Sequence, residues 1–323
     1  MPLVSMSGLL AAARAGGYAV CYCEAWNLES LQAVVEGAEA MSSPIIAGFN
    51  GGFLRHPARA WPERLAYYGA LSAALAGSAV PTAFILNETD DLPQIEEGLE
   101  RGFNAVMVES DSLAPEEYID LVKKVVRMAH ARSASVEAQV GRLPHGCGDG
   151  AGNGEVTNPG VARAFVEKTG VDALGVSIGN VHILTRGQAS INVESLARIR
   201  EQVDVPLVVH GGTGFPAAYA AQVIALGVAK FNFGTNLKQA YLAALREKLA
   251  PYSAPMNPHL FLGMGGPEDI LVAARIAVKQ RVQELIETYG FAGARLRPGA
   301  AASLQIPADS PAREHPDTRW KSK

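Results

Sequence analysis

The sequence predicts an α/β fold, a (β/α)₈ TIM barrel with an extra C-terminal helix, and three observations predict it. Short apolar runs alternate with amphipathic runs eight times between residues 18 and 249, which favours a closed barrel over an open sheet. The apolar runs contain few polar residues, as strands do that are buried on both faces of a sheet. Polar residues and glycines follow several of these runs directly, at the strand ends where such barrels carry their active sites.

The expected strands are runs of five to seven apolar or β-branched residues, the usual length of a buried strand. In chain order they are residues 18–23, 44–49, 81–86, 105–109, 134–140, 173–178, 206–210 and 229–233.

The expected helices are longer runs in which apolar residues recur every three or four positions, and three of them begin at a proline that suits the first turn. A first helix covers the apolar run 9–13. The helices between and after the strands are 28–41, 63–76, 92–101, 115–131, 159–169, 193–202, 217–226 and 237–249, and a further helix covers 267–289. We therefore expect one barrel domain over residues 1–290. Residues 291–323, rich in Pro, Ala, Asp and Arg, are expected to form a disordered tail.

Composition excludes several classes of protein. A hydrophobic content of 48% supports a large core, and the net charge of −4 comes without a basic block that could bind nucleic acid,. No apolar run is long enough to span a membrane. The three cysteines have no spacing typical of a disulfide framework or zinc ribbon, so we expect a reducing, cytoplasmic location.

Two histidines follow strands that the pattern makes neighbours. His210 ends the seventh strand and is followed by the turn Gly211-Gly212-Thr213-Gly214, and His182 follows the sixth strand. Two imidazoles at adjacent strand ends indicate a divalent metal site. Glu88, after the third strand, is the best-placed third ligand, although it also fits a helix cap.

A phosphate site is expected beside these histidines. A glycine turn, hydroxyls and a cation can together bind a phosphate dianion. The candidates are Gly211, Thr213, Lys230, Asn232 and Thr235. The glycine-rich connection 141–155 after the fifth strand is typical of a mobile lid, with a plain surface insertion as the alternative.

At this point the sequence resembles the class II ketose-bisphosphate aldolases over roughly residues 5 to 290. The residues that carry the resemblance are Gly17-Tyr18-Ala19-Val20, Ser43-Pro44-Ile45-Ile46, Val136-Glu137-Ala138, Gly141-Arg142-Leu143, the run 169–174, Ile178-Gly179 with His182, the run 205–212, and Lys230 with Asn232 and Thr235. The resemblance implies a barrel, a zinc-type divalent ion, and reversible cleavage of a ketose phosphate to dihydroxyacetone phosphate and an aldehyde. It implies that His182 and His210 bind the metal, and it implies dimers or tetramers.

Several departures fall on the residues that perform the family's chemistry. The family's Asp-His pair after the third strand, acid/base group and metal ligand, is replaced here by Asn87-Glu88. Asn87 can hydrogen-bond a substrate but cannot take its proton, and the loss of such a group typically costs on the order of 10²- to 10⁴-fold in rate. The family's Asn after the first strand is replaced within Cys21-Tyr22-Cys23-Glu24. We therefore expect Glu24, or His145, Asp149 or Glu155 of the 141–155 connection, to handle protons.

Three functions follow from these residues. The first is a diverged, metal-dependent aldehyde-lyase that cleaves a phosphorylated ketose or related keto compound. The second is a ketose-phosphate isomerase or epimerase acting through an enediolate. The third is a catalytically inactive sugar-phosphate-binding homologue or non-catalytic subunit. We expect zinc as the ion, with iron(II) or manganese(II) as alternatives because a His₂-carboxylate set admits them. The expected partners are a small phosphorylated substrate and a second copy of the chain.

Overall fold

The computed structural model is a closed barrel of eight parallel strands, and it describes residues 3–110, 112–144, 146 and 156–290. Each strand pairs with the next along the chain, and β8 pairs with β1 to close the ring. The strands are β1 (Val20–Ala25), β2 (Ile45–Asn50), β3 (Thr82–Thr89), β4 (Ala105–Val108), β5 (Ser135–Val140), β6 (Ala173–Val176), β7 (Leu207–Val209) and β8 (Val228–Phe233). The predicted fold class is confirmed.

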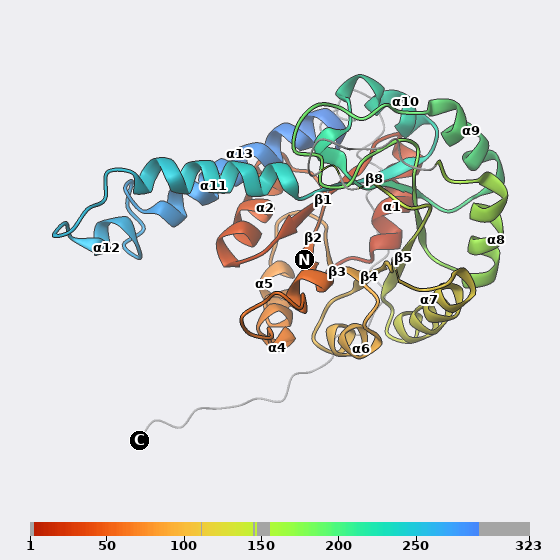
Figure 1. Ribbon diagram of the computed structural model, residues 1–323, viewed down its shortest axis with the longest axis horizontal. Coiled ribbons are helices and arrows are strands. Elements are labelled where there is room, and N and C mark those ends of the chain that lie inside the picture. Colours follow the sequence, from red (N-terminus) through yellow and green to blue (C-terminus); the bar gives the residue numbers. More distant parts are fainter. Residues whose placement is uncertain (1–2, 111, 145, 147–155, 291–323) are drawn as a thin grey trace.

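Helices surround this ring (Figure 1). They are α1 (Met6–Gly16), α2 (Leu28–Ala40), α3 (Gly51–Leu54), α4 (Leu65–Gly69), α5 (Ser72–Leu75), α6 (Leu92–Glu100), α7 (Pro115–His130), α8 (Pro159–Thr169), α9 (Val193–Gln202), α10 (Ala220–Ala225), α11 (Thr235–Leu249), α12 (Pro258–Phe261) and α13 (Ile270–Tyr289). The extra C-terminal helix is α13, as expected. The predicted tail, residues 291–323, lies outside the described residues.

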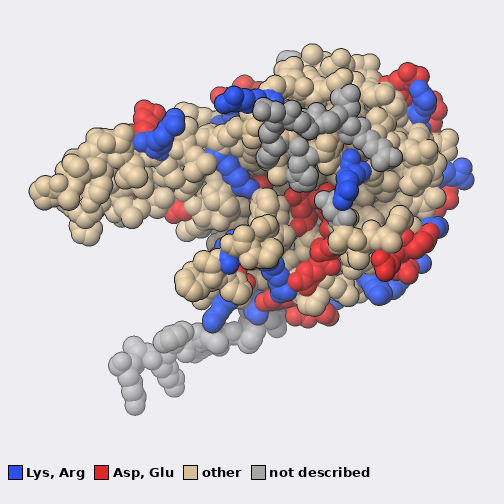
Figure 2. All heavy atoms as spheres, in the orientation of Figure 1, with Lys and Arg blue, Asp and Glu red and all other residues tan. Residues whose placement is uncertain are grey.

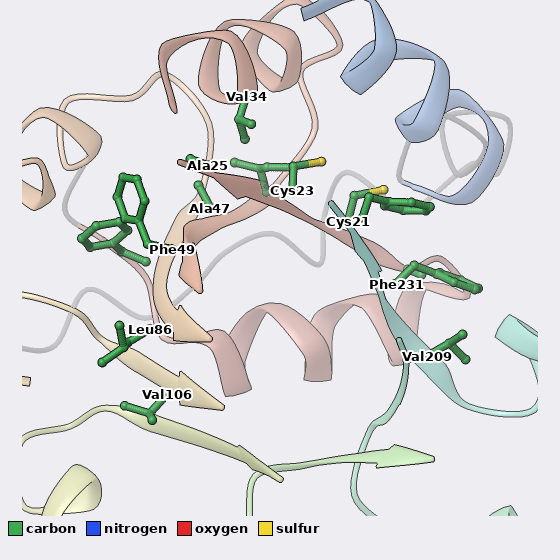
Figure 3. Close-up of a cluster of buried hydrophobic side chains, with 14 of the residues drawn as sticks. Cys21, Cys23, Ala25, Val34, Ala47, Phe49, Leu86, Val106, Val209 and Phe231 are labelled. Carbon is green, nitrogen blue, oxygen red and sulfur yellow. The ribbon is translucent and has the colours of Figure 1, made fainter. Parts of the chain in front are cut away.

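Alternate residues of the strands serve two separate cores. Cys21 and Cys23 of β1 face outward in the larger cluster, where Val34 of α2 packs against the sheet (Figure 3). Tyr22, between them, faces the barrel interior in a second cluster that includes Met6 and Leu10 of α1. Helix α1 therefore packs against the interior residues of the barrel, and the opposite, carboxyl ends of the strands remain for the site.

Three predicted elements differ from the structure. The helix expected over 63–76 is two short helices, α4 and α5, and the one expected over 217–226 begins as a 3₁₀ turn (Ala217–Tyr219) before α10. The third strand continues beyond residue 86 to Thr89, with an irregular register against β4 between Leu86 and Thr89. This third difference matters most, because it places Asn87 and Glu88 inside the strand rather than after it.

Two helices extend beyond the ring as an arm. Helices α11 and α13 pack along each other, and the chain between them, which includes α12, forms the far tip of the molecule in Figure 1. None of the described helices has both the length and the apolar character that a membrane crossing requires.

Candidate functional site

A cavity of about 290 Å³ opens at the carboxyl ends of the strands. Strand ends, the turn after β7 and the first turn of α11 supply its lining. The lining residues that matter for chemistry are Tyr22, Glu24, Asn50, Glu88, His182, Gly211, Thr213, Asn232, Thr235 and Lys238. The sequence had selected seven of these ten positions, Glu24, Glu88, His182, Gly211, Thr213, Asn232 and Thr235, and the fold brings them to one cavity.

A larger hollow of about 780 Å³ lies beside α7 and α8. Its described lining contains Glu109, Gln139 and Arg142 but no histidine. We place the candidate site in the smaller cavity because convergent titratable groups, rather than volume, identify a reactive site.

Glu88 enters the cavity through an irregularity in β3. Its backbone is left-handed, with φ 55°, a conformation that costs a residue with a side chain about 1–2 kcal/mol,. Two amides fix the carboxylate: the Asn87 Nδ2 donates to Oε1 at 2.8 Å and the Asn50 Nδ2 donates to Oε2 at 2.6 Å. Asn87 itself is buried and is not among the residues that line the cavity. Its place in the structure is that of a partner to Glu88.

Glu88 lies between the two predicted metal histidines. Its Oε1 is 3.6 Å from His182 Nε2 and 3.6 Å from His210 Nδ1. These separations are too long for hydrogen bonds, whereas two ligands of one tetrahedral zinc ion lie about 3.4 Å apart, given bonds of roughly 2.1 Å. The donor set therefore fits a divalent ion in its chemistry and in both carboxylate distances.

Glu88, His182 and His210 do not form a closed metal site in this conformation. The two imidazole centroids are 6.3 Å apart, and no group of three His, Cys, Asp or Glu side chains within the described ranges has the spacing to hold a metal ion. Burial raises the pKa of Glu88, but both histidines outweigh burial and lower it to about 2. Glu88 is therefore ionised and available as a ligand at neutral pH.

His210 is held from behind by a buried carboxylate. Its ring is fully buried and its Nε2 lies 2.7 Å from Glu137 Oε1. Metal-binding histidines commonly donate their second ring N–H to a carboxylate in this way, which fixes the ring and its tautomer. Burial lowers the pKa of His210, but Glu137 and Glu88 outweigh burial and raise it to about 9. Glu137, which the sequence had offered only as part of a family motif, thus orients a predicted ligand.

Lys230 is not where the sequence had placed it. Its Nζ lies 2.7 Å from Glu137 Oε2, and both side chains are completely buried beneath the site. It is absent from the cavity lining. The prediction that Lys230 belongs to the phosphate site, or phosphate cradle, formed with Gly211, Thr213, Asn232 and Thr235 is therefore corrected. Because β8 turns the Lys230 side chain into the barrel core, its charge balances Glu137 instead.

The remaining cradle residues surround the start of α11. Gly211, with φ 69°, passes so close to the segment that follows β6 that a side chain there would lie 2.1 Å from the Val181 carbonyl oxygen. Thr213, two residues further on, lies beside α11, where its Oγ1 accepts the backbone N–H of Asn236 at 3.3 Å. Thr235 is the first residue of that helix. A helix N-terminus with a glycine turn and hydroxyls is a common setting for a phosphate.

Lys238 supplies a cation that was not among the residues predicted from the sequence. It lies one turn into α11, lines the cavity, and its Nζ is 2.6 Å from Glu24 Oε1. Burial raises the pKa of Glu24, and the charge of Lys238 opposes that shift. The signal was available in the sequence: position 238 is three residues after Thr235, on the same face of the helix. The other proton carriers proposed from sequence, His145, Asp149 and Glu155, lie outside the described residues.

Comparisons with known proteins identify the family to which this fold belongs. Residues 4–294 match the family described as fructose-bisphosphate aldolase class-II. The chain is 30% identical to the YdjI aldolase of Escherichia coli K12, with a TM-score of 0.73 over 90% of this chain and 98% of that one. It is 25% identical to a putative fructose-1,6-bisphosphate aldolase of Coccidioides immitis, with a TM-score of 0.69 over 88% and 96%. A fructose-bisphosphate aldolase of Campylobacter jejuni, 22% identical with a TM-score of 0.68 over 89% and 95%, shares the fold. The chain belongs to the class II fructose-bisphosphate aldolase family.

Proposed function

We propose that the protein is a metal-dependent aldehyde-lyase that reversibly cleaves a phosphorylated ketose or a related keto compound and releases a product of the dihydroxyacetone phosphate type. The observation that carries the proposal is the position of Glu88 Oε1, 3.6 Å from a nitrogen of each of two histidines. The same cavity contains the phosphate-type groups Gly211 and Thr235. To bind a phosphorylated substrate and cleave it, the metal ligands and the phosphate site must lie no farther apart than the length of one small molecule.

The ion we propose is zinc, with iron(II) or manganese(II) as alternatives, held by His182, His210 and Glu88. When bound, it supplies Lewis-acid polarisation of the substrate carbonyl. The residues of the chain do the rest. Glu137 holds the His210 ring through Nε2, and Asn87 and Asn50 hold the Glu88 carboxylate. Such supporting contacts keep ligands within reach of a common point.

The phosphate end of the substrate is assigned to the start of α11. Thr213, the first helical residue Thr235 and Lys238 all line the cavity, and they can supply hydroxyls, a backbone N–H and an ammonium to a phosphate,. A dianion would compete with the Glu24 carboxylate for Lys238, since Glu24 now accepts its hydrogen bond at 2.6 Å. Glu24 would then be released as a base while the substrate is held.

Proton transfer is therefore assigned to Glu24. Its carboxylate lines the cavity and is close enough to Glu88 for the two charges to interact. Asn87, which occupies the place of the family's acid/base aspartate, cannot accept a proton. A raised pKa suits a general base, because it brings the group toward the working pH.

A second candidate, a catalytically inactive sugar-phosphate-binding homologue, is favoured by a separate observation. No group of three His, Cys, Asp or Glu side chains in the described part of the chain has the spacing to hold an ion, and Glu24 is engaged by Lys238. Binding of a phosphorylated ligand needs only the Glu24–Lys238 contact to change, whereas catalysis needs both features to change.

Metal content separates the two candidates. We expect protein purified without chelators to contain one divalent ion per chain, and His210→Ala to lose it while the fold survives. Glu88→Gln tests the third ligand. The wild type should also release dihydroxyacetone phosphate from at least one member of a panel of ketose phosphates. Absence of metal would leave the binding protein as the surviving candidate, and metal retained in His210→Ala would contradict the site.

The partner we propose is a second copy of the chain, docked through the arm. Residues 249–266 contain no Asp, Glu, Lys or Arg. They expose large apolar side chains, among them Leu262 at 53% and Met264 at 63%. Figure 2 shows the far tip of the arm free of charged atoms, with a group of acidic and basic side chains farther back along it. Two such arms can pack together without burying an unpaired charge, and isologous pairing is the commonest homo-oligomer contact. Leu242 of α11 is both exposed and part of the cavity lining, so the docked copy would adjoin the site.

Light scattering or sedimentation tests this partner. Leu262→Glu should convert a dimer or tetramer to a smaller species. Val161→Glu is the matched control, because Val161 is exposed to 55% on α8, away from the arm. A monomeric wild type, or an unchanged mass in Leu262→Glu, would refute docking through this surface.

A further inference from the structure

Tyr22 has a role that the metal and phosphate assignments leave open. It lies on β1, points into the barrel and is 2% exposed. Its ring lies beneath the site, with the Lys230 Nζ 4.9 Å from the ring centroid. It also belongs to the lining of the cavity. Tyr22 therefore forms part of the floor on which a ligand in the cavity would rest.

The Tyr22 hydroxyl is buried without a hydrogen-bond partner among the described residues. A buried hydroxyl left in this way costs about 1–3 kcal/mol, so proteins rarely retain one. Other buried tyrosines here satisfy theirs: Tyr289 donates to the Phe215 carbonyl oxygen at 2.7 Å, and Tyr118 donates to the Val108 carbonyl oxygen at 2.7 Å. The unmet hydroxyl of Tyr22 thus stands out as one that needs a group from outside the chain.

A second unmet atom belongs to the neighbouring strand. Asn232 on β8 is the Cα partner of Tyr22 on β1, so neighbouring strands present both side chains at the same level of the barrel. The Asn232 Oδ1 is also buried without a partner among the described residues, and Asn232 also lines the cavity. One atom can donate and the other can only accept. A carbonyl oxygen would satisfy Tyr22 alone, whereas a hydroxyl group would satisfy both.

We infer that the Tyr22 hydroxyl is a substrate contact, and that together with Asn232 Oδ1 it recognises a hydroxyl group on the carbon skeleton of the substrate. This inference rests on the proposed function and narrows its substrate to one that carries a free hydroxyl at the cavity floor. Tyr22 donates to the ligand oxygen, and the ligand hydroxyl donates to Asn232.

The electrostatic surroundings keep Tyr22 in the donor form. Burial raises its pKa well above the ordinary value, and the carboxylates of Glu24, Glu88 and Glu137 raise it further. A phenol that stays protonated at every working pH acts as a fixed hydrogen-bond donor and not as a base. The acid/base assignment of Glu24 is therefore unaffected.

Binding measurements on Tyr22→Phe test the inference with two probes. Calorimetry would measure the Kd of dihydroxyacetone phosphate, which has a phosphate and a free hydroxyl, and of inorganic phosphate, which has no carbon skeleton. Loss of one ligand hydrogen bond should weaken the first about tenfold. The second should be unchanged, because the cradle at α11 remains intact. The melting temperature should stay equal or rise, because a buried unmet hydroxyl is removed.

Tyr289→Phe is the matched control. It removes a hydroxyl that is bonded within the chain, so it should lower the melting temperature and leave both Kd values unchanged. Equal binding of dihydroxyacetone phosphate by wild type and Tyr22→Phe would refute the Tyr22 assignment alone. A wild type that binds phosphate but not dihydroxyacetone phosphate would refute the proposed function and this assignment with it. Weakening of both probes, or a fall in stability like that of Tyr289→Phe, would make the role of the hydroxyl structural.

Discussion

Two glutamate–lysine pairs lie at different depths of the same barrel. Glu137 and Lys230 join β5 to β8 beneath the site at 2.7 Å, and both side chains are 0% exposed. Glu24 and Lys238 join β1 to α11 in the cavity wall at 2.6 Å, where Lys238 is 32% exposed. The chemistry is the same, but only the upper pair can exchange its partner for a ligand. The depth of each pair in the barrel therefore decides whether it supports the site from below or can bind a ligand.

The electrostatics of the lower pair follow from that depth. Burial raises the pKa of Glu137, but Lys230 and His210 outweigh burial and hold it below its ordinary value. The carboxylate stays ionised and holds the His210 ring. In the upper pair Lys238 is 32% exposed, so water can replace its partner and the pair contributes less to stability than the lower one,.

The largest expected effect comes from breaking the lower pair. Lys230→Met leaves Glu137 charged and without its lysine in the barrel core, and should cost on the order of 3–5 kcal/mol of unfolding free energy. Denaturation in urea measures it. Lys238→Met, the same change in the upper pair, is the control and should stay within about 1 kcal/mol of wild type. Similar losses in both variants would remove the distinction between the pairs.

Catalysis should depend on the upper pair through Glu24. Once a substrate is found, Glu24→Gln should lower kcat by at least about 10²-fold, the usual effect of a general base, while ligand binding persists. Because burial raises the pKa of Glu24, the acidic limb of the wild-type kcat profile should fall above the ordinary range of a glutamate, and the variant should lack it. An unchanged kcat with a raised KM would make Glu24 a binding residue.

Phosphate recognition should also depend on the upper lysine and not on the lower one. Thermal stabilisation by dihydroxyacetone phosphate should exceed that by free dihydroxyacetone. Lys238→Met should weaken dihydroxyacetone phosphate binding about tenfold, the loss of one charge-assisted contact. Lys230→Met, assayed at a temperature where it is folded, serves as the comparison. Equal stabilisation of the wild type by the uncharged ligand would refute a phosphate site.

The smallest expected effect, on phosphate affinity, tests whether the phosphate cradle includes the first residue of α11. Thr235→Val removes one neutral hydroxyl at the start of α11 and keeps the shape of the side chain, so phosphate binding should weaken only a few-fold. The Kd for inorganic phosphate measures it. No change in that Kd, with a clear effect in Lys238→Met, would move the phosphate along α11 away from its first residue.

Much of the fold was readable because its signals are local. Eight apolar runs predict the eight strands, and Pro115 and Pro159 mark the starts of α7 and α8,. The prediction of one helix over 63–76 was wrong, because the spacing of apolar residues does not show where a helix is interrupted. Among the site residues, His182 and His210 could be found because His210 ends a predicted strand and His182 comes four residues after another.

Residues whose roles depend on depth could not be assigned in this way. Lys230 and Lys238 are both lysines near the end of β8, and the sequence favoured the first because it lies within the apolar run. Tyr22 could not be singled out from the sequence, because an unmet hydroxyl can be recognised only when all surrounding atoms are in place.

The sequence by itself determined the order of strands and helices, the strand ends at which polar groups gather, and the family. Those features follow from periodicity and from short runs of neighbouring residues. Tertiary structure decided which lysine faces the cavity, that an irregular β3 turns Glu88 toward two histidines, and that Glu137 supports His210. Each of these depends on how strands far apart in the chain meet, and burial sets the charge, the partners and the accessibility of a side chain only once they have met.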